Sequence, residues 1–255
     1  MTTESSGTTN HFLLLTGASS GIGREIAIQM SRSHRLILSG RDAVRLEETR
    51  QACCDPESHI IWPFDLSRVD ELGASLTLLL AEKKARVSAF VHCAAVLKIL
   101  PLRSLSLEQI RDIFNINFFS AMELTTVLIK KKINDRQLRS VVFISSIASK
   151  FGARGFSAYS ASKGALDALM KSLAVELAAE VRVNSVLPGG VRTRMTEAIY
   201  EDAEMVAKLE RDYPLGIGEA TDIVNVVEFL ISEKSRWITG QQIVVDGGRT
   251  VNITA

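Results

Sequence analysis

Tyr159 and Lys163 are the side chains whose types and spacing best suit acid–base chemistry in this sequence. They lie four positions apart in the segment Gly155–Glu180, whose pattern predicts a helix, so both are expected on one helix face. A free tyrosine has a pKa of about 10, and a neighbouring lysine cation favours the phenolate and lowers that pKa. The pair therefore predicts a tyrosine that exchanges a proton near neutral pH. The spacing alone also occurs by chance in many helices, so the surrounding sequence decides between the two interpretations.

A serine at the end of an apolar run supplies part of that context. Ser146 directly follows the predicted strand Ser140–Ser145 and precedes Tyr159 by 13 positions. A side chain that leaves the carboxyl end of a strand points into the crevice where open α/β sheets bind ligands. The Ser146 hydroxyl is then placed to hold a substrate carbonyl beside the tyrosine proton.

A glycine-rich turn near the start of the chain predicts a phosphate-binding site. The apolar run Phe12–Thr16 leads into Gly17, Gly21 and Gly23 and then into a predicted helix. The N–H groups at such a helix start can hold a dinucleotide pyrophosphate, and glycine permits the tight turn and the close approach. The spacing is G-x-x-x-G-x-G rather than the general G-x-G-x-x-G, so a turn that serves packing alone stays an alternative.

The same turn also matches G-x-S-x-G, the nucleophile elbow of α/β-hydrolases. That fold needs several strands before the elbow, whereas one predicted strand precedes it here. The hydrolase triad also needs a late histidine, and His92 is the last histidine of the chain. The hydrolase interpretation is therefore rejected.

The elements that must position these residues alternate between short apolar runs and longer amphipathic ones. The predicted strands are Phe12–Thr16, Arg35–Ser39, His59–Phe64, Ser88–His92, Ser140–Ser145, Val181–Leu187 and Gln242–Val245. The predicted helices are Gly21–Arg32, Asp42–Cys53, Ser67–Lys84, Ser106–Ile133, Gly155–Glu180, Thr196–Leu209 and Glu219–Ser232, of which Ser106–Ile133 is long enough to indicate a bend or a longer central helix. This alternation predicts an α/β fold, a doubly wound Rossmann-type parallel sheet of about seven strands with helices on both faces.

The composition narrows the domain organisation and the function classes. The chain has 255 residues, and we expect a flexible tail over residues 1–10 and a single domain over residues 11–255. A formal net charge of +1 gives no field that attracts nucleic acid or a membrane surface, and no apolar stretch reaches the ~18 residues that span a bilayer. Three cysteines, two of them adjacent, make neither a disulfide framework nor a metal-ligand spacing. A reduced, cytoplasmic location without a bound metal is expected.

Together these motifs resemble the single-domain branch of the short-chain dehydrogenase/reductase family over roughly residues 11–248. The family's T-G-x-x-x-G-x-G turn corresponds to residues 16–23, its proline–glycine segment to residues 184–193, and its closing strand to residues 237–248. Its active-site set corresponds to Asn117, Ser146, Tyr159 and Lys163. One departure is visible, because the chain has His-Cys-Ala-Ala at residues 92–95 where the family usually has N-N-A-G. We interpret the histidine as structural and the cysteine as a small buried filler.

The resemblance implies a role for each matched residue. Tyr159 gives a proton to a carbonyl oxygen as hydride reaches the carbon, Lys163 lowers the tyrosine pKa and binds the nicotinamide ribose, and Ser146 orients the carbonyl. Asn117 holds a water that links the lysine to solvent, and Thr193 orients the carboxamide. The implied cofactor-binding residues are Gly17, Ser19, Ser20, Gly21, Ile22, Gly23, Arg41, Asp65, Leu66, Ala94, Tyr159, Lys163, Pro188, Gly189, Val191 and Thr193.

The end of the second predicted strand bears on the choice between NADP and NAD. The position of the acid that binds the ribose 2′-hydroxyl of NAD holds Gly40 and is followed by Arg41, whose guanidinium suits the 2′-phosphate of NADP. Asp42 could serve as an NAD-binding acid, but we interpret it as the N-cap of the next helix, so the sequence favours NADP over NAD. Asp65 is expected to meet the adenine, or alternatively to cap the helix that begins near Ser67.

The expected substrate is a small carbonyl or alcohol compound, and the overall pattern resembles 3-oxoacyl-thioester reductases most. The expected pocket walls, Val96–Leu100, Phe151–Phe156, Met195 and Tyr200, are mostly apolar. An NAD-dependent alcohol, polyol or steroid dehydrogenase stays an alternative, as does a regulator that senses NADP(H) without turnover. The resemblance also implies a homo-oligomer, either a tetramer or a dimer.

Overall fold

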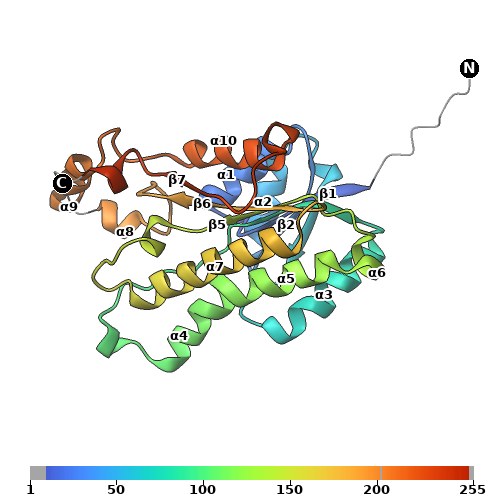
Figure 1. Ribbon diagram of the computed structural model, residues 1–255, viewed down its shortest axis with the longest axis horizontal. Coiled ribbons are helices and arrows are strands. Elements are labelled where there is room, and N and C mark those ends of the chain that lie inside the picture. The colour runs from blue at the N-terminus through green and yellow to red at the C-terminus, as the bar shows by residue number, and fades with distance from the viewer. Residues whose placement is uncertain (1–9, 202, 253–255) are drawn as a thin grey trace, which may run out of the picture.

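The computed structural model describes residues 10–201 and 203–252 (Figure 1). The predicted tail therefore lies, apart from Asn10, outside the described residues. The strands are β1 His11–Thr16, β2 Arg35–Gly40, β3 Ile60–Pro63, β4 Arg86–His92, β5 Ser140–Ile144, β6 Arg182–Pro188 and β7 Gln242–Val245. The helices are α1 Gly21–Met30, α2 Ala43–Gln51, α3 Val69–Glu82, α4 Leu107–Phe114, α5 Ser120–Ile129, α6 Lys131–Asn134, α7 Ser157–Glu176, α8 Glu197–Tyr200, α9 Ala203–Asp212 and α10 Ala220–Ile231.

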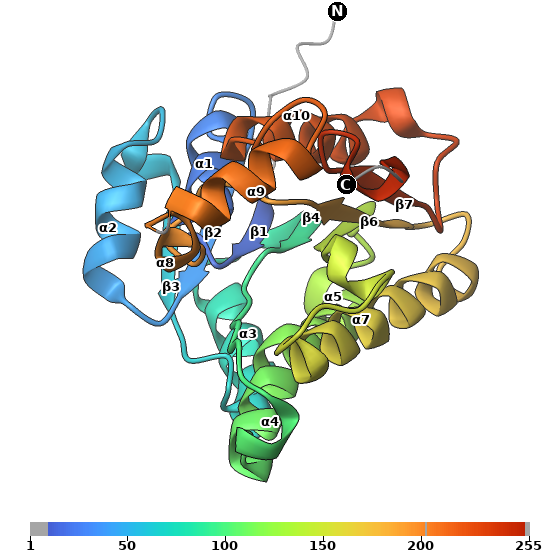
Figure 2. The ribbon, with the colours of Figure 1, turned by 90° about the vertical axis from the view of Figure 1, so that its left-hand side faces the viewer.

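The seven strands form one parallel sheet in the order β3-β2-β1-β4-β5-β6-β7. The predicted α/β fold with a sheet of about seven strands is thus confirmed. The strand order reverses between β1 and β4, and the carboxyl ends of the strands at such a reversal form the usual ligand crevice of an open α/β sheet. The helices α8 and α9, which lie between β6 and α10 in the chain, are at the end of the molecule that faces the viewer in Figure 2.

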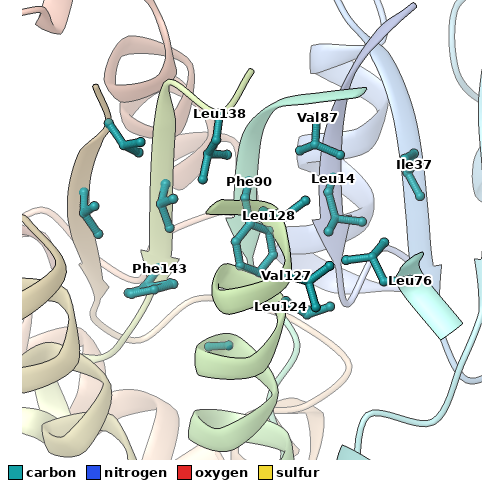
Figure 3. Packing of buried hydrophobic residues seen from close by; sticks show 14 of the residues in the cluster. Leu14, Ile37, Leu76, Val87, Phe90, Leu124, Val127, Leu128, Leu138 and Phe143 are labelled. Carbon is teal, nitrogen blue, oxygen red and sulfur yellow. The ribbon is translucent and has the colours of Figure 1, made fainter. Parts of the chain in front are cut away.

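Helices cover both faces of the sheet, as the continuous apolar strands require. On one face, α3, α5 and α7 pack on side chains such as Phe90 and Phe143, and Figure 3 shows α5 lying over these strands. On the other face, α1, α2 and α10 pack on side chains such as Leu13 and Val186. Within residues 10–201 and 203–252, no helix is long and apolar enough to cross a membrane.

The long segment predicted over residues 106–133 is not one regular helix. Ser106 caps α4 through a reciprocal pair of hydrogen bonds with Gln109, and a π-helical turn, Asn115–Phe119, then separates α4 from α5. A π turn inserts one residue into the hydrogen-bond pattern and often marks a functional position. Here it contains Asn117, one of the predicted active-site residues.

Candidate active site

The glycine-rich turn between β1 and α1 has no room for side chains at two of its positions. A Cβ atom on Gly17, whose φ is +70°, would lie 2.7 Å from the backbone nitrogen of Ala94. A Cβ atom on Gly23 would lie 2.1 Å from the carbonyl oxygen of Gly17. These glycines therefore let the turn, the start of α1 and the end of β4 come together, and they leave the turn's backbone open to a phosphate group.

Thr16 joins the carboxyl ends of the two central strands. Its hydroxyl oxygen accepts hydrogen bonds from the backbone nitrogens of Cys93 and Ala94, both at 3.2 Å. The hydroxyl proton is then directed at Nδ1 of His92, 3.0 Å away. This arrangement requires a histidine ring that accepts at Nδ1.

His92 is completely buried, and burial lowers its pKa to about 3. The imidazole is therefore neutral at physiological pH and cannot act there as a cationic acid. Its environment agrees with the interpretation of His92 as a structural residue. Cys93, in contrast to the buried filler that we expected, is only partly buried and lines the cleft described next.

A cleft of about 540 Å³ opens at the carboxyl ends of β1, β2, β3 and β4. It contains most of the predicted cofactor-binding residues, namely Gly17, Ser19, Ser20, Gly21, Ile22, Gly23, Arg41, Asp65, Leu66, Ala94 and Thr193. It also contains residues that the sequence did not assign to the cofactor, namely Gly40, Asp42, Arg45, Phe64, Cys93, Ala95, Val96, Ile116, Arg194 and Met195. Because its lining comes from the ends of four neighbouring strands, the cleft suits an extended ligand such as a dinucleotide.

The end of the cleft beside β2 carries two arginines. Arg41 and Arg45 both line it, and Asp42 lies between them in the chain. Asp42 caps α2, because its Oδ1 accepts a hydrogen bond of 3.1 Å from the backbone nitrogen of Arg45, which confirms the predicted N-cap. Its Oδ2 lies 3.3 Å from Nε of Arg45, so the carboxylate is already engaged by a cation.

Asp65 at the end of β3 does not cap a helix. Helix α3 begins at Val69 with Arg68 as its N-cap, so the alternative of a helix cap at Asp65 is wrong. The Asp65 carboxylate instead accepts a hydrogen bond of 3.0 Å from the backbone nitrogen of Ser67. This hydrogen bond, together with the nearby cation Arg41, lowers the pKa of Asp65 and keeps it ionised in the cleft.

Tyr159 and Lys163 lie on the buried face of α7, as their spacing predicts. The expected lowering of the tyrosine pKa is wrong for this arrangement, because burial raises the pKa of Tyr159 to about 12 and a hydrogen bond with Ser146 opposes that shift only in part. The lysine ammonium lies over the tyrosine ring, with Nζ 5.8 Å from the ring centroid. Tyr159 is therefore a protonated phenol at neutral pH.

Lys163 is almost completely buried, with 1% of its surface exposed. Its Nζ donates a hydrogen bond of 2.7 Å to the carbonyl oxygen of Ile144 at the end of β5. Burial lowers the pKa of Lys163 to about 8, because the charged form loses its hydration. Ser146 follows Ile144 by two positions, so the end of β5 brings the predicted serine, tyrosine and lysine together.

Asn117 is fully buried in the π-helical turn, and both ends of its amide are paired. Its Oδ1 accepts a hydrogen bond of 2.8 Å from the Val96 nitrogen, and its Nδ2 donates to the Val96 oxygen and to Oγ of Ser162. The amide thus fixes the loop after β4 against the helix that carries Tyr159. That Asn117 also holds a water molecule stays a prediction.

The segment after β6 folds over the glycine-rich turn. The nitrogen of Gly189 donates to the Val245 carbonyl and that of Gly190 to the Tyr213 hydroxyl, which fixes the start of the segment. Further along, the side chain of Thr193 lies against Gly21, with its Cβ 3.3 Å from where a Cβ on that glycine would lie. The predicted cofactor residues Pro188, Gly189, Val191, Tyr159 and Lys163 are not among those that line the cleft.

The expected substrate walls are placed only in part. Val96 and Met195 line the cleft, whereas Tyr200 lines a separate shallow hollow with Arg192 and Glu197. The loops after β4 and β5 lie side by side, because the nitrogen of Leu100 donates a hydrogen bond of 3.1 Å to the carbonyl oxygen of Gly155.

Several known sequences are similar to this chain over most of its length. A family model described as enoyl-(acyl carrier protein) reductase matches residues 17–250. L-rhamnose-1-dehydrogenase of Scheffersomyces stipitis is 30% identical, with 94% of this chain and 95% of the relative covered. D-erythrulose reductase of Gallus gallus is 31% identical, again with 94% and 95% covered. A 3-oxoacyl-(acyl-carrier-protein) reductase of Thermotoga maritima is 29% identical, with 93% and 97% covered.

Solved structures show the same fold. A short-chain type dehydrogenase/reductase from Mycobacterium ulcerans has a TM-score of 0.84 and 32% identity, with 95% of this chain and 90% of that chain covered. A 4-hydroxyisoleucine dehydrogenase complexed with NADH has a TM-score of 0.89 and 27% identity, with 95% and 100% covered. A protein from Beutenbergia cavernae, assigned as an NAD(P)-dependent gluconate 5-dehydrogenase and solved with NADP at low occupancy, has a TM-score of 0.88 and 29% identity, with 96% and 98% covered.

Proposed function

The chain belongs to the short-chain dehydrogenase/reductase family of oxidoreductases, and from that premise we propose that it reduces a ketone with NADPH, with Tyr159 as the proton donor. The observation that carries the proposal is the convergence of Ser146, Tyr159 and Lys163 at the end of β5, next to the cleft that contains the glycine-rich turn. Relatives of this chain include both reductases and dehydrogenases, so the direction and the cofactor are part of the proposal.

The residues of the cleft fit a dinucleotide. Because Gly17 and Gly23 have no Cβ atom, the turn can pack against the end of β4 and lead directly into α1, whose first N–H groups can then bind a pyrophosphate. At the other end, Arg41 and Arg45 provide cations for a ribose 2′-phosphate. Asp42 is engaged as a helix cap and by Arg45, which disfavours its use as the acid that binds the NAD ribose. These contacts support NADP, although structural neighbours are recorded with NADH and with NADP.

The chemistry then divides between cofactor and chain. NADPH, when bound, supplies the hydride that reduces the carbonyl carbon. Tyr159, a phenol at neutral pH, donates its proton to the carbonyl oxygen, which gains negative charge during the reduction. Ser146 shares a hydrogen bond with Tyr159 and orients the carbonyl, and the ammonium of Lys163 stabilises the phenolate that remains.

The proposed substrate is a mainly apolar ketone, because the apolar side chains of Val96, Ile116 and Met195 are among those that line the cleft. A 3-oxoacyl thioester is one such compound and suits the resemblance to the Thermotoga maritima reductase. The cytoplasmic location, the single domain and the homo-oligomer stay predictions.

The test is turnover of a ketone panel, including a 3-oxoacyl thioester, with NADPH and with NADH in parallel. The proposal expects turnover with NADPH and weaker turnover with NADH. Faster alcohol oxidation with NAD would favour the alternative of an NAD-dependent dehydrogenase. Binding of NADPH without turnover of any member of the panel would favour a regulator that senses the cofactor.

A further inference from the structure

Asp167 is a buried carboxylate to which no described residue donates a hydrogen bond. It lies on α7 one turn after Lys163, on the same buried helix face, and only 3% of its surface is exposed. Neither of its carboxylate oxygens has a hydrogen-bond partner among the described residues. A buried carboxylate without partners costs folding free energy, and buried polar groups in proteins are rarely left unpaired. Such a group calls for a reason other than stability.

The surroundings of Lys163 supply that reason. The titratable groups that act on or lie against the ammonium are His92 and Cys93 at the end of β4, and Tyr159 and Asp167 on α7. His92 is uncharged at neutral pH, since burial lowers its pKa to about 3. Burial raises the pKa values of Cys93 and Tyr159 to about 12, so both are also uncharged. Asp167 is a carboxylate that lies one helix turn from Lys163 on the same buried face of α7, where a negative charge favours the ammonium form of the lysine.

Lys163 needs such a charge, because its ammonium group is almost completely buried. Its Nζ donates a hydrogen bond to the neutral carbonyl of Ile144, which supplies no negative charge. A buried cation tends to lose its proton, and a neutral lysine amine no longer stabilises a phenolate on Tyr159. A negative charge one helix turn away opposes that loss.

We propose that Asp167 is the countercharge that holds Lys163 in its ammonium form, and that it thereby positions the lysine to assist Tyr159 up to mildly alkaline pH. Asp167 acts through Lys163 and does not touch the reacting atoms. The inference rests on the proposed function, because it names the charge that keeps Lys163 protonated while Tyr159 donates its proton.

The variant that tests the proposal is Asp167→Asn, which removes the charge at nearly constant volume. We expect the alkaline limb of the kcat/KM profile to move down by about one pH unit, which is a loss of roughly tenfold at the pH where the wild type begins to decline. The melting temperature should fall at neutral pH, because the variant leaves the buried Lys163 ammonium without its countercharge. Glu176→Gln is the matched control, since it removes an exposed carboxylate from the far end of the same helix and should change neither quantity.

A titration of the lysine side chains by carbon-13 NMR separates this inference from the proposed function, because it needs no turnover. The signal assigned with Lys163→Arg should titrate at lower pH in Asp167→Asn than in the wild type. An unchanged titration and pH profile, or a uniform loss of activity at every pH, would overturn the proposal. If Asp167→Asn does not fold, Asp167→Glu and Asp167→Ser replace it, and equal alkaline limbs in these two variants would overturn the proposal as well.

Discussion

Removal of the Arg41 guanidinium should weaken the binding of NADPH and leave the affinity for NADH nearly unchanged. The two cofactors differ only in the ribose 2′-phosphate, and Arg41 and Arg45 line the end of the cleft where the second strand ends. A hydrogen bond to a charged group contributes about 1.5–3 kcal/mol, which corresponds to roughly ten- to a hundredfold in affinity. Because Arg41 is exposed and Arg45 remains, we expect Arg41→Ala to weaken NADPH binding by about tenfold, at the lower end of that range.

The assay is a fluorescence titration of both cofactors at constant ionic strength, since salt screens an exposed ion pair. Arg32→Ala is the control, because it removes an exposed arginine just after α1 and outside the cleft. NADH affinity should be nearly equal in the wild type and in both variants. An equal loss for NADPH and NADH in Arg41→Ala, or no loss for either, would refute the assignment of the 2′-phosphate to Arg41. If the wild type binds NADH more tightly than NADPH, Asp42 would instead be the residue that binds the ribose 2′-hydroxyl.

Three further substitutions test the structure of the site. Gly23→Ala places a Cβ 2.1 Å from the Gly17 oxygen and should lower both the melting temperature and NADPH affinity, whereas Gly164→Ala, with open space around its Cβ position inside α7, should keep NADPH affinity and leave the melting temperature equal or higher. Burial lowers the pKa of His92 to about 3, so the unfolded chain binds its proton first, and stability falls as pH drops below about 6.5. Urea unfolding should therefore show that wild type loses about 2 kcal/mol more than His92→Asn between pH 7 and pH 5, and equal losses would contradict this account. Thr16→Val should cost about 2 kcal/mol or more in the same assay, because it leaves two backbone N–H groups without their acceptor, and an unchanged midpoint would contradict that role.

Much of the fold follows from local sequence patterns. The continuous apolar runs fix the seven strands to within a few residues, since a strand covered on both faces must be apolar along its length. The segment over residues 106–133 is predicted less well, because a π-helical turn keeps the amphipathic pattern while it changes the hydrogen bonding. The segment over residues 196–209 also divides, into α8 and α9.

The site is predicted where chemistry depends on spacing, and missed where it depends on burial. The glycine-rich turn and the pair Tyr159–Lys163 can be found from sequence, because each occupies a short stretch. The raised pKa of Tyr159 cannot, since it arises from burial beneath segments distant in the chain. Arg45 could have been found, because it lies one helix turn after Arg41 in the predicted helix next to the cleft. Asp167 carries no sequence signal, as only the structure shows that its carboxylate is buried and unpaired.

The most direct test of the account follows the hydride and the proton in one experiment. The protein would be given NADPH deuterated at the transferring position of nicotinamide C4, together with a ketone that it turns over, and the product analysed by mass spectrometry. We predict deuterium on the carbinol carbon with the wild type, and for Tyr159→Phe a rate lower by about 10²–10⁴-fold with NADPH affinity nearly unchanged. A product without deuterium, or a Tyr159→Phe variant that keeps more than about a tenth of the wild-type rate, would contradict hydride transfer from NADPH with Tyr159 as the proton donor.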